Sequence, residues 1–224
     1  MTSNSTFPQR LTQVDDLIRP DHYYLADDDT CYFLGEYTAR ADYSVSATNS
    51  LIFNFKKSVD RRGKPEWQYK GKAIRQSAEA FRRAINDAWF NGATLIPIPP
   101  SKARTDPLYD DRLTRMLKAI RPQPPLDIRE LIVQKASTEA AHHSDTRLRP
   151  EALEALYEID QTLIAPTPTV IGLFDDVLTT GAHFKAAQSI LQKTFPDVRV
   201  IGLFIARRVP ETIDIEALFG DLDE

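Results

Sequence analysis

The chain has 224 residues, of which 42% are hydrophobic and 27% are charged, and its formal net charge is −4. These values are ordinary for a globular protein that buries a core of its own, and the negative charge argues against a general nucleic-acid binder. No apolar run approaches the roughly 20 residues of a membrane span, no secretory signal is visible, and the single cysteine, Cys31, excludes an intrachain disulfide, so we expect a cytoplasmic protein without membrane contact.

The N-terminal third predicts a lead-in followed by a small β-structure. Residues 1–30 are polar and predict a loosely ordered segment. Aromatic and β-branched residues in 31–39 and 48–56 predict two strands, paired antiparallel. Residues 58–69 contain Gly and Pro and predict a loop. We therefore expect residues 1–69 to form a lead-in and a hood over the rest of the chain.

Charge is unevenly distributed along the chain. Residues 56–83 hold ten Lys and Arg against three acids, whereas residues 211–224 hold six acids and no base. The basic stretch is either a solvated helix face with its loop or a surface that attracts a polyanion such as nucleic acid. The last segment predicts an acidic tail.

From residue 70 onward, helical and strand patterns alternate. Apolar spacing predicts a helix over 70–91, which Asn91-Gly92 closes. Further strands are predicted at Thr94–Ile98, Asp127–Val133, Val170–Phe174 and Val198–Ala206, and further helices at 112–120, 150–160 and 181–195. This alternation predicts an α/β fold over residues 70–210, Rossmann-like, with a mostly parallel sheet and helices on both faces.

The strongest functional signal follows the strand Val170–Phe174. Two acids, Asp175 and Asp176, come next, and after an apolar pair the segment Thr179-Thr180-Gly181-Ala182 opens a helix. The first N–H groups of a helix have no internal partner and bind anions. Acids next to a bound phosphate would repel it unless hydroxyl groups or a metal lay between them. A sugar phosphate, whose hydroxyls can face the acids, fits this arrangement. The structural alternative is a buried strand with a Thr/Gly-rich turn.

This joined pattern resembles the motif that binds 5-phosphoribosyl 1-pyrophosphate (PRPP) in type I phosphoribosyltransferases, with Gly172 inside the hydrophobic run as the departure. The resemblance implies that Asp175 and Asp176 hold the ribose hydroxyls, act in catalysis and face Mg²⁺ as cofactor. It also implies that the phosphate of the ribose is wrapped by Leu178, Thr179, Thr180, Gly181, Ala182 and His183.

The predicted strand Thr94–Ile98 continues into a proline-rich loop that could aim donors at a phosphate. With Asp106, Tyr109, Asp110 and Arg112 after it, this loop is similar to the ComF-like branch of the superfamily, although the zinc ribbon common in that branch is missing. The resemblance implies that the pyrophosphate is bound by Pro100, Ser101, Lys102 and Arg104, with Arg112 as a further candidate. A plain surface turn is the alternative.

Residues 134–149 form a long polar segment, and loops of this length are often lids or binding loops. Its position resembles the flexible catalytic loop of the superfamily, which implies roles for Lys135, Thr138 and Arg147, the first and last of them catalytic. His142 and His143 stand where the family has a Gln. They are either solvated loop residues or donors of hydrogen bonds to the leaving pyrophosphate. Arg207-Arg208 ends the last strand at the same rim and is a candidate neighbour of the base or pyrophosphate.

The sequence therefore leaves three hypotheses for function. The first is a phosphoribosyltransferase that uses PRPP and a nitrogenous base and releases pyrophosphate. The second is a non-catalytic sensor of PRPP or a nucleotide that engages nucleic acid, through residues 56–83, or a protein partner. The third is a hydrolase that uses water as acceptor in the same site. A homodimer is a further partner that we consider.

Overall fold

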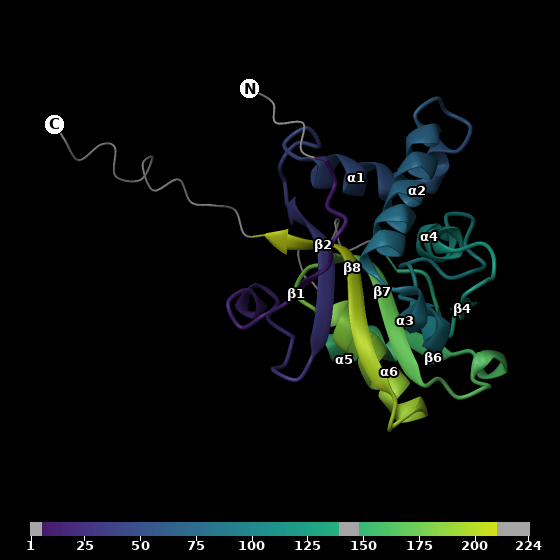
Figure 1. The fold of residues 1–224 in the computed structure, drawn as a ribbon. Helices are drawn as coiled ribbons and strands as arrows, with labels where there is room; N and C mark the ends of the chain where they lie inside the picture. Colours follow the sequence, from purple (N-terminus) through teal and green to yellow (C-terminus); the bar gives the residue numbers. More distant parts are fainter. Residues whose placement is uncertain (1–5, 139–147, 210–224) are drawn as a thin grey trace.

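The computed structural model describes residues 6–138 and 148–209 and has an α/β fold (Figure 1). A six-stranded sheet has the order β1-β2-β8-β7-β3-β4, and all its neighbours are parallel except β1 and β2. Its strands are β1 (Thr12–Gln13), β2 (Thr30–Thr38), β3 (Ala93–Pro97), β4 (Asp127–Ile128), β7 (Val170–Leu178) and β8 (Arg199–Val209). The predicted α/β class with a mostly parallel sheet is confirmed, and the arrangement is compatible with a Rossmann-like fold.

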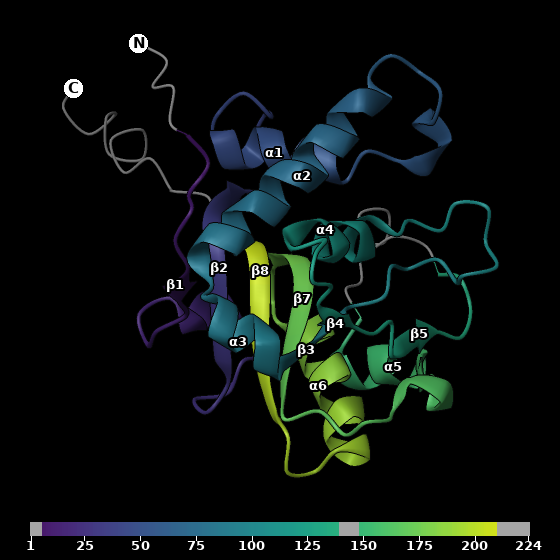
Figure 2. The ribbon, with the colours of Figure 1, turned by 45° about the vertical axis from the view of Figure 1, so that its right-hand side comes forward.

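Helices cover both faces of this sheet (Figure 2). Leu95 of β3 packs with α1, α2 and α4 in one hydrophobic cluster, and the next residue, Ile96, packs with α5 and α6 in the other. Successive strand residues point to opposite faces, so two clusters mean two covered faces. The helices are α1 (Ala47–Phe55), α2 (Trp67–Ala84), α3 (Asp87–Gly92), α4 (Arg112–Ile120), α5 (Pro150–Ala155) and α6 (Ala182–Thr194).

The predicted strand over residues 48–56 is wrong, because this segment is helix α1. Ser46 caps the helix by accepting a hydrogen bond from the N–H of Asn49 at 3.0 Å. The buried residues Leu51, Ile52 and Phe55 follow helical spacing, which the aromatic content of the segment masked. The strand predicted at 31–39 exists as β2, but it pairs parallel with β8 in the main sheet, and its antiparallel neighbour is β1.

The N-terminal segment is also more ordered than its polarity predicts. Within the described part, Phe7, Val14 and Leu25 are buried in the two hydrophobic clusters, and His22 is completely inaccessible to solvent. The prediction of a loosely ordered lead-in is therefore wrong for residues 6–30. A few apolar residues among many polar ones are enough to fix this segment across the sheet.

Several predicted element boundaries are shifted. The helix predicted from residue 70 to 91 begins at Trp67 in the predicted loop, which also holds a 3-10 turn at Val59–Arg61. It stops at Ala84, because Asn86 caps a separate helix, α3, by accepting from the N–H of Trp89 at 2.7 Å. At the predicted motif helix, α6 begins at Ala182, one residue later than expected.

Two further segments divide between the main sheet and a small antiparallel sheet. The predicted strand Asp127–Val133 consists of β4, which pairs with β3, and β5 (Ile132–Gln134), which pairs with β6 (Tyr157–Ile159). The helix predicted over 150–160 therefore ends at Ala155. In β6 the buried residues alternate with an exposed one, a strand pattern too short to be recognised next to a helix.

The predicted hood and core share the main sheet, since β2 belongs to the first 69 residues and pairs with β8. The predicted acidic tail, 211–224, lies outside the described residues. Among the helices of residues 6–138 and 148–209, none is long and apolar enough to span a membrane.

Candidate functional site

A crevice opens beside β7 because its two neighbouring strands end at different heights. Pairing with β3 stops at Phe174 opposite Pro97, whereas pairing with β8 continues to Leu178 opposite Arg207. After the N–H of Ile98 donates to the carbonyl of Phe174 at 2.8 Å, the chain leaves the sheet. Ligands of parallel sheets bind at such places, outside the carboxyl ends of the strands.

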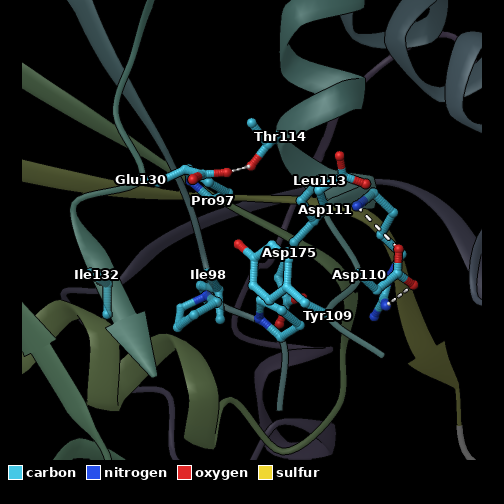
Figure 3. A pocket seen from close by; sticks show the side chains of 13 residues that line it. Pro97, Ile98, Tyr109, Asp110, Asp111, Leu113, Thr114, Glu130, Ile132 and Asp175 are labelled. Atoms are coloured by element: carbon cyan, nitrogen blue, oxygen red, sulfur yellow. Dashed lines mark hydrogen bonds and ion pairs between the residues drawn. The ribbon is translucent and has the colours of Figure 1, made fainter. Parts of the chain in front are cut away.

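Asp175 lies at this opening and lines a small pocket of about 30 Å³, which we call the acid-pair pocket (Figure 3). The other walls are the proline-rich segment 97–100, the segment 109–114 that leads into α4, and residues Glu130 and Ile132. The structure therefore brings together the motif strand and the predicted pyrophosphate loop, including Pro100. The pocket has room for a few atoms and not for a whole sugar phosphate.

Asp176 is held as an anion between two cations. Its side chain is on the opposite face of β7 from Asp175, and the residue is 4% exposed. One oxygen lies 2.9 Å from Lys56 Nζ and the other 2.7 Å from Arg112 Nη2. Burial opposes ionisation, but the charges of Lys56 and Arg112 outweigh it and hold the pKa of Asp176 well below its usual range.

Asp175 has a different environment. It is half-buried, and one of its oxygens accepts a hydrogen bond from the backbone N–H of Asp176 at 2.7 Å. Burial, and then the negative charge of Asp176, raise the pKa of Asp175 to about 7. The pair therefore combines one carboxylate that is ionised at neutral pH with one that changes protonation near neutral pH.

The loop after the acid pair turns into α6 through a glycine. Gly181 has a φ of +85°, and a Cβ built there would lie 3.0 Å from Leu25 Cδ2. Glycine is therefore required both by the left-handed backbone and by the space available. The first helical hydrogen bond runs from the N–H of Lys185 to the carbonyl of Gly181 at 2.9 Å. The N–H groups before it have no partner within the helix, and such groups bind anions.

The N-terminal segment holds this loop through hydrogen bonds to its backbone carbonyls. The ring nitrogen Nδ1 of His22 hydrogen-bonds the carbonyl of Thr179, and the N–H of Tyr24 donates to the carbonyl of Thr180 at 2.8 Å. Burial lowers the pKa of His22, so this ring is neutral at neutral pH. No local pattern indicates this role, because His22 stands alone in a polar segment.

The predicted contact His183 has a side chain committed elsewhere. Its Nδ1 lies 3.0 Å from the hydroxyl oxygen of Tyr157, in β6. Burial lowers the pKa of His183 and raises that of Tyr157, so both groups are neutral near pH 7. A contribution of His183 to anion binding would therefore come from its backbone N–H.

The predicted pyrophosphate loop meets the start of the predicted catalytic loop. The carbonyl of Ser101 accepts from the N–H of Thr138 at 2.8 Å, and the N–H of Ala103 donates to Ser137 Oγ at 3.1 Å. Lys102, half-buried, lies in the turn between these contacts. These hydrogen bonds join the two loops next to Pro100, which lines the acid-pair pocket, and their roles in binding stay predictions.

Two other predicted contacts have side chains that are paired with protein groups in this arrangement. Arg104 pairs with Glu130 at 3.1 Å and with Asp160 at 3.4 Å. The Nζ of Lys135 donates to the carbonyl of Ala155 at 3.0 Å. For these two side chains to contact pyrophosphate, they would have to exchange these partners.

The remaining candidates are distributed between the sheet and the segment outside the described residues. Arg207 pairs with Glu36 at 2.6 Å and with Asp21 at 3.0 Å, so it joins β8 to β2 and the lead-in. Its neighbour Arg208 has a buried Nε without a hydrogen-bond partner among the described residues. The predicted residues His142, His143 and Arg147 lie outside the described residues.

A buried lysine that the sequence interpretation missed supports the acid pair. Lys70 of α2 is 1% exposed, and its Nζ donates to the carbonyls of Phe55 and Lys57 at 2.9 and 2.8 Å. The same Nζ lies 2.7 Å from Asp110, whose carboxylate also pairs with Arg112 at 2.8 Å. Lys70 shares the buried face of its helix with Ile74 and Phe81, and a lysine in an apolar pattern was the available signal.

The result is a closed arrangement that we call the charged ring. Asp176 binds Arg112, Arg112 binds Asp110, and Asp110 binds Lys70. Lys70 in turn holds the two carbonyls that flank Lys56, which returns to Asp176. Helix α1, helix α2 and the start of α4 are therefore connected to the acid pair by charged hydrogen bonds. The members of the ring are Lys56, Lys70, Asp110, Arg112 and Asp176.

The donor set does not fit a metal held by the protein at the acid pair. Within the described ranges, no group of three or more His, Cys, Asp or Glu side chains could hold an ion. Both oxygens of Asp176 already contact cations, which would repel a divalent ion at that carboxylate. Magnesium carried by a pyrophosphate needs few protein ligands and many waters, and in that form it stays a prediction.

Comparison of the sequence with models of known protein families finds no match, and comparison with curated proteins finds none either. Support for a function therefore comes from the motif residues and from the geometry around them.

Proposed function

We propose that this chain binds PRPP at the crevice beside β7 and transfers its phosphoribosyl group to a nitrogenous acceptor, with release of pyrophosphate. One observation carries the proposal. The acid pair is followed by a glycine-initiated helix start whose Thr179 and Thr180 carbonyls are held from behind by His22 and Tyr24. This gives the loop a fixed shape, with hydroxyls and helix N–H groups available to a phosphate three to six residues from the acids.

The phosphate of the ribose has a role in this scheme although it lies far from the bond that breaks. The first N–H groups of α6 and the hydroxyls of Thr179 and Thr180 would hold it. Binding energy from such a remote group can be used to orient the reacting carbon. Because Gly181 and His22 fix the loop before the ligand arrives, little ordering is needed on binding.

Asp175 is suited to the charge that develops on the ribose. Loss of pyrophosphate loosens the bond at the anomeric carbon and builds positive, oxocarbenium-like character on the ring, as in glycoside cleavage. An ionised carboxylate beside the ring offsets this charge. With a pKa of about 7, Asp175 supplies that charge above neutral pH and becomes a neutral hydrogen-bonding group below it.

The leaving pyrophosphate would lie toward the rim formed by residues 97–104 and the start of the following loop. Magnesium, where present, would neutralise part of its charge. Pro99 and Pro100 stiffen this rim, and Ser101 is tied to Thr138. The rim therefore gives the leaving group a defined position while the ribose is held by the acid pair.

A second candidate function is non-catalytic sensing of PRPP or a nucleotide. It is favoured by the two cations on Asp176, because Lys56 and Arg112 must move or share that carboxylate before a ribose hydroxyl can donate to it. The basic stretch 56–83 supports a nucleic-acid partner less directly, since Lys56 and Lys70 point inward to acids. Contact with nucleic acid through this stretch stays a prediction.

The deciding experiment is a calorimetric titration with PRPP and Mg²⁺. Wild type should bind with micromolar affinity, and the Asp175→Asn, Asp176→Asn double variant should lose binding while its circular dichroism stays native. Asp28→Asn, an exposed aspartate of the lead-in, is the matched control and should bind as wild type does. Unchanged affinity in the folded double variant, or no binding to wild type, would refute the assignment.

Turnover separates the two candidates once binding is established. Nitrogenous bases are screened for pyrophosphate release, and release that depends on the acid pair identifies a transferase. Tight binding without release, together with a salt-dependent shift on DNA or RNA, identifies the sensor.

A further inference from the structure

The hood carries a second and much larger depression, which we call the hood groove. It has a volume of about 550 Å³ and lies between the end of β2, helix α1 and the segment from Lys56 to Glu66. This volume is within the range of small-molecule sites in proteins. Lys56 lines this groove and also contacts Asp176, which places the groove on the same side of the sheet as the acid pair.

One wall of the groove is an exposed aromatic stack. The rings of Tyr43 and Phe53 are 5.3 Å apart at an interplanar angle of 28°. They are 53% and 54% exposed, so neither ring serves the hydrophobic core. A stacked pair with open faces offers a planar ligand a surface on which to stack, with little loss of side-chain freedom.

The groove is also cationic. Lys56, Lys57 and Arg61 line it against a single acid, Glu66. The Nζ of Lys57 lies 4.7 Å from the centre of the Phe53 ring, so charge and aromatic surface occur at the same place. The acid is a weak competitor, because it lies 4.0 Å from Arg61 and both are substantially exposed.

We infer that the hood groove binds a planar aromatic ring that carries negatively charged groups. The ring would stack on Tyr43 and Phe53, and its anionic groups would meet Lys57 and Arg61. The ligand's role as the acceptor of the phosphoribosyl group rests on the function proposed above, whereas its binding does not.

Lys56 couples this groove to the acid pair. It lines the groove, and its Nζ lies 2.9 Å from Asp176. An anion in the groove competes with Asp176 for this lysine and thereby frees one carboxylate oxygen for a ribose hydroxyl. Such coupling is reciprocal, so a ribose phosphate at the acid pair must also change the affinity of the groove for its ligand.

The binding test uses isophthalate, an aromatic dianion, and a cyclohexane dicarboxylate, which has the same charge without an aromatic face. Isophthalate should bind the full chain saturably in calorimetry, and at least about fivefold more tightly than its saturated analogue. The Phe53→Ala, Lys57→Gln variant should lose at least about tenfold in affinity.

The matched control is the Tyr69→Ala, Lys72→Gln variant. Tyr69 and Lys72 form a similar exposed pair on α2, with Nζ 5.1 Å from the ring centre, and both lie outside the lining of the groove. This variant should bind isophthalate as wild type does. Equal binding of the two dicarboxylates, no binding, or equal losses in both variants would overturn the inference.

A second titration separates this inference from the proposed function. With isophthalate saturating, the affinity for ribose 5-phosphate should change at least about threefold in wild type and stay constant in Lys56→Gln. If isophthalate binds the groove but no ribose phosphate binds the chain, the proposed function fails and the groove stands. If PRPP binds and isophthalate does not, the groove inference alone fails.

Discussion

Lys70 and Asp110 are 40 residues apart in the chain, yet Lys70 Nζ lies 2.7 Å from the carboxylate of Asp110 in the interior. Burial lowers the pKa of Lys70, and the charge of Asp110 opposes this shift. A cation is placed in an apolar helix face only where its partners compensate for lost hydration. Here the partners are Asp110 and two carbonyls beside Lys56, so the position of Lys56 at the acid pair depends on a lysine in another helix.

Lys70→Met is predicted to destabilise the protein and to weaken ribose-phosphate binding. The change leaves the two carbonyls without this donor and Asp110 with Arg112 as its remaining partner in the charged ring, which costs about 3 to 5 kcal/mol by analogy with broken buried ion pairs. Urea unfolding measures the loss, and Lys72→Met on the exposed face of α2 is the control, expected within about 0.5 kcal/mol of wild type. Equal stability of the two variants would show that the charged ring contributes nothing.

Asp175→Asn is predicted to stabilise the fold above neutral pH. The folded state raises the pKa of Asp175 from 3.8 to about 7, so the folded protein binds this proton more tightly than the unfolded chain. Stability from this group is therefore present at low pH and is lost as pH rises from about 4 to 7. Removing the group should gain on the order of 1 to 4 kcal/mol at about pH 8 and little at about pH 4.

Asp176→Asn is predicted to change the stability of the fold in the opposite direction. Lys56 and Arg112 hold the pKa of Asp176 below its usual range, so its stabilisation is present at neutral pH and disappears on acidification. This variant should be less stable than wild type at neutral pH. Urea midpoints that move in the same direction for both variants would contradict the assignment of the two charges.

The sequence was sufficient where local pattern and tertiary environment agree. The buried strand at 170–174, the helix start after Gly181 and the helix at 112–120 were predictable because their apolar residues follow one period over enough positions. Asp175 and the proline-rich loop follow predicted strands that are parallel neighbours in the sheet, and both line the acid-pair pocket, as expected for segments at the carboxyl ends of such strands.

The features missed by the sequence interpretation depend on contacts between distant segments. Residues 48–56 fit both a strand and a helix, and only packing against α2 and the sheet decides between them. His22 and Lys70 are single polar residues, and their partners lie 157 and 40 positions away. No local pattern specifies such pairs, so the supporting contacts of His22 and Lys70 could not be predicted from composition or spacing.

Binding of ribose 5-phosphate is predicted to strengthen as pH rises through the pKa of Asp175, which is about 7. The ionised form accepts hydrogen bonds from ribose hydroxyls, and the protonated form offers one acceptor fewer. Titrations across this range should show a rise with a midpoint near that value in wild type. Asp175→Asn should keep only the shallower dependence of the ligand's own phosphate, whose second pKa is about 6. A pH profile identical in both proteins would exclude Asp175 from ribose binding.

Gly181→Val is predicted to abolish phosphate binding, because a β-branched residue cannot adopt a φ of +85° without strain and its Cβ would press against Leu25. Gly63 is the matched control, since it has the same φ of +85° but no neighbouring atom within 4 Å of an added Cβ. Gly63→Val therefore carries the backbone strain, about 1 to 2 kcal/mol, without touching the 178–183 loop. Thermal unfolding with and without inorganic phosphate should show protection in wild type and Gly63→Val and none in Gly181→Val. Equal protection in all three proteins would place the phosphate elsewhere and remove the main support for PRPP as the ligand.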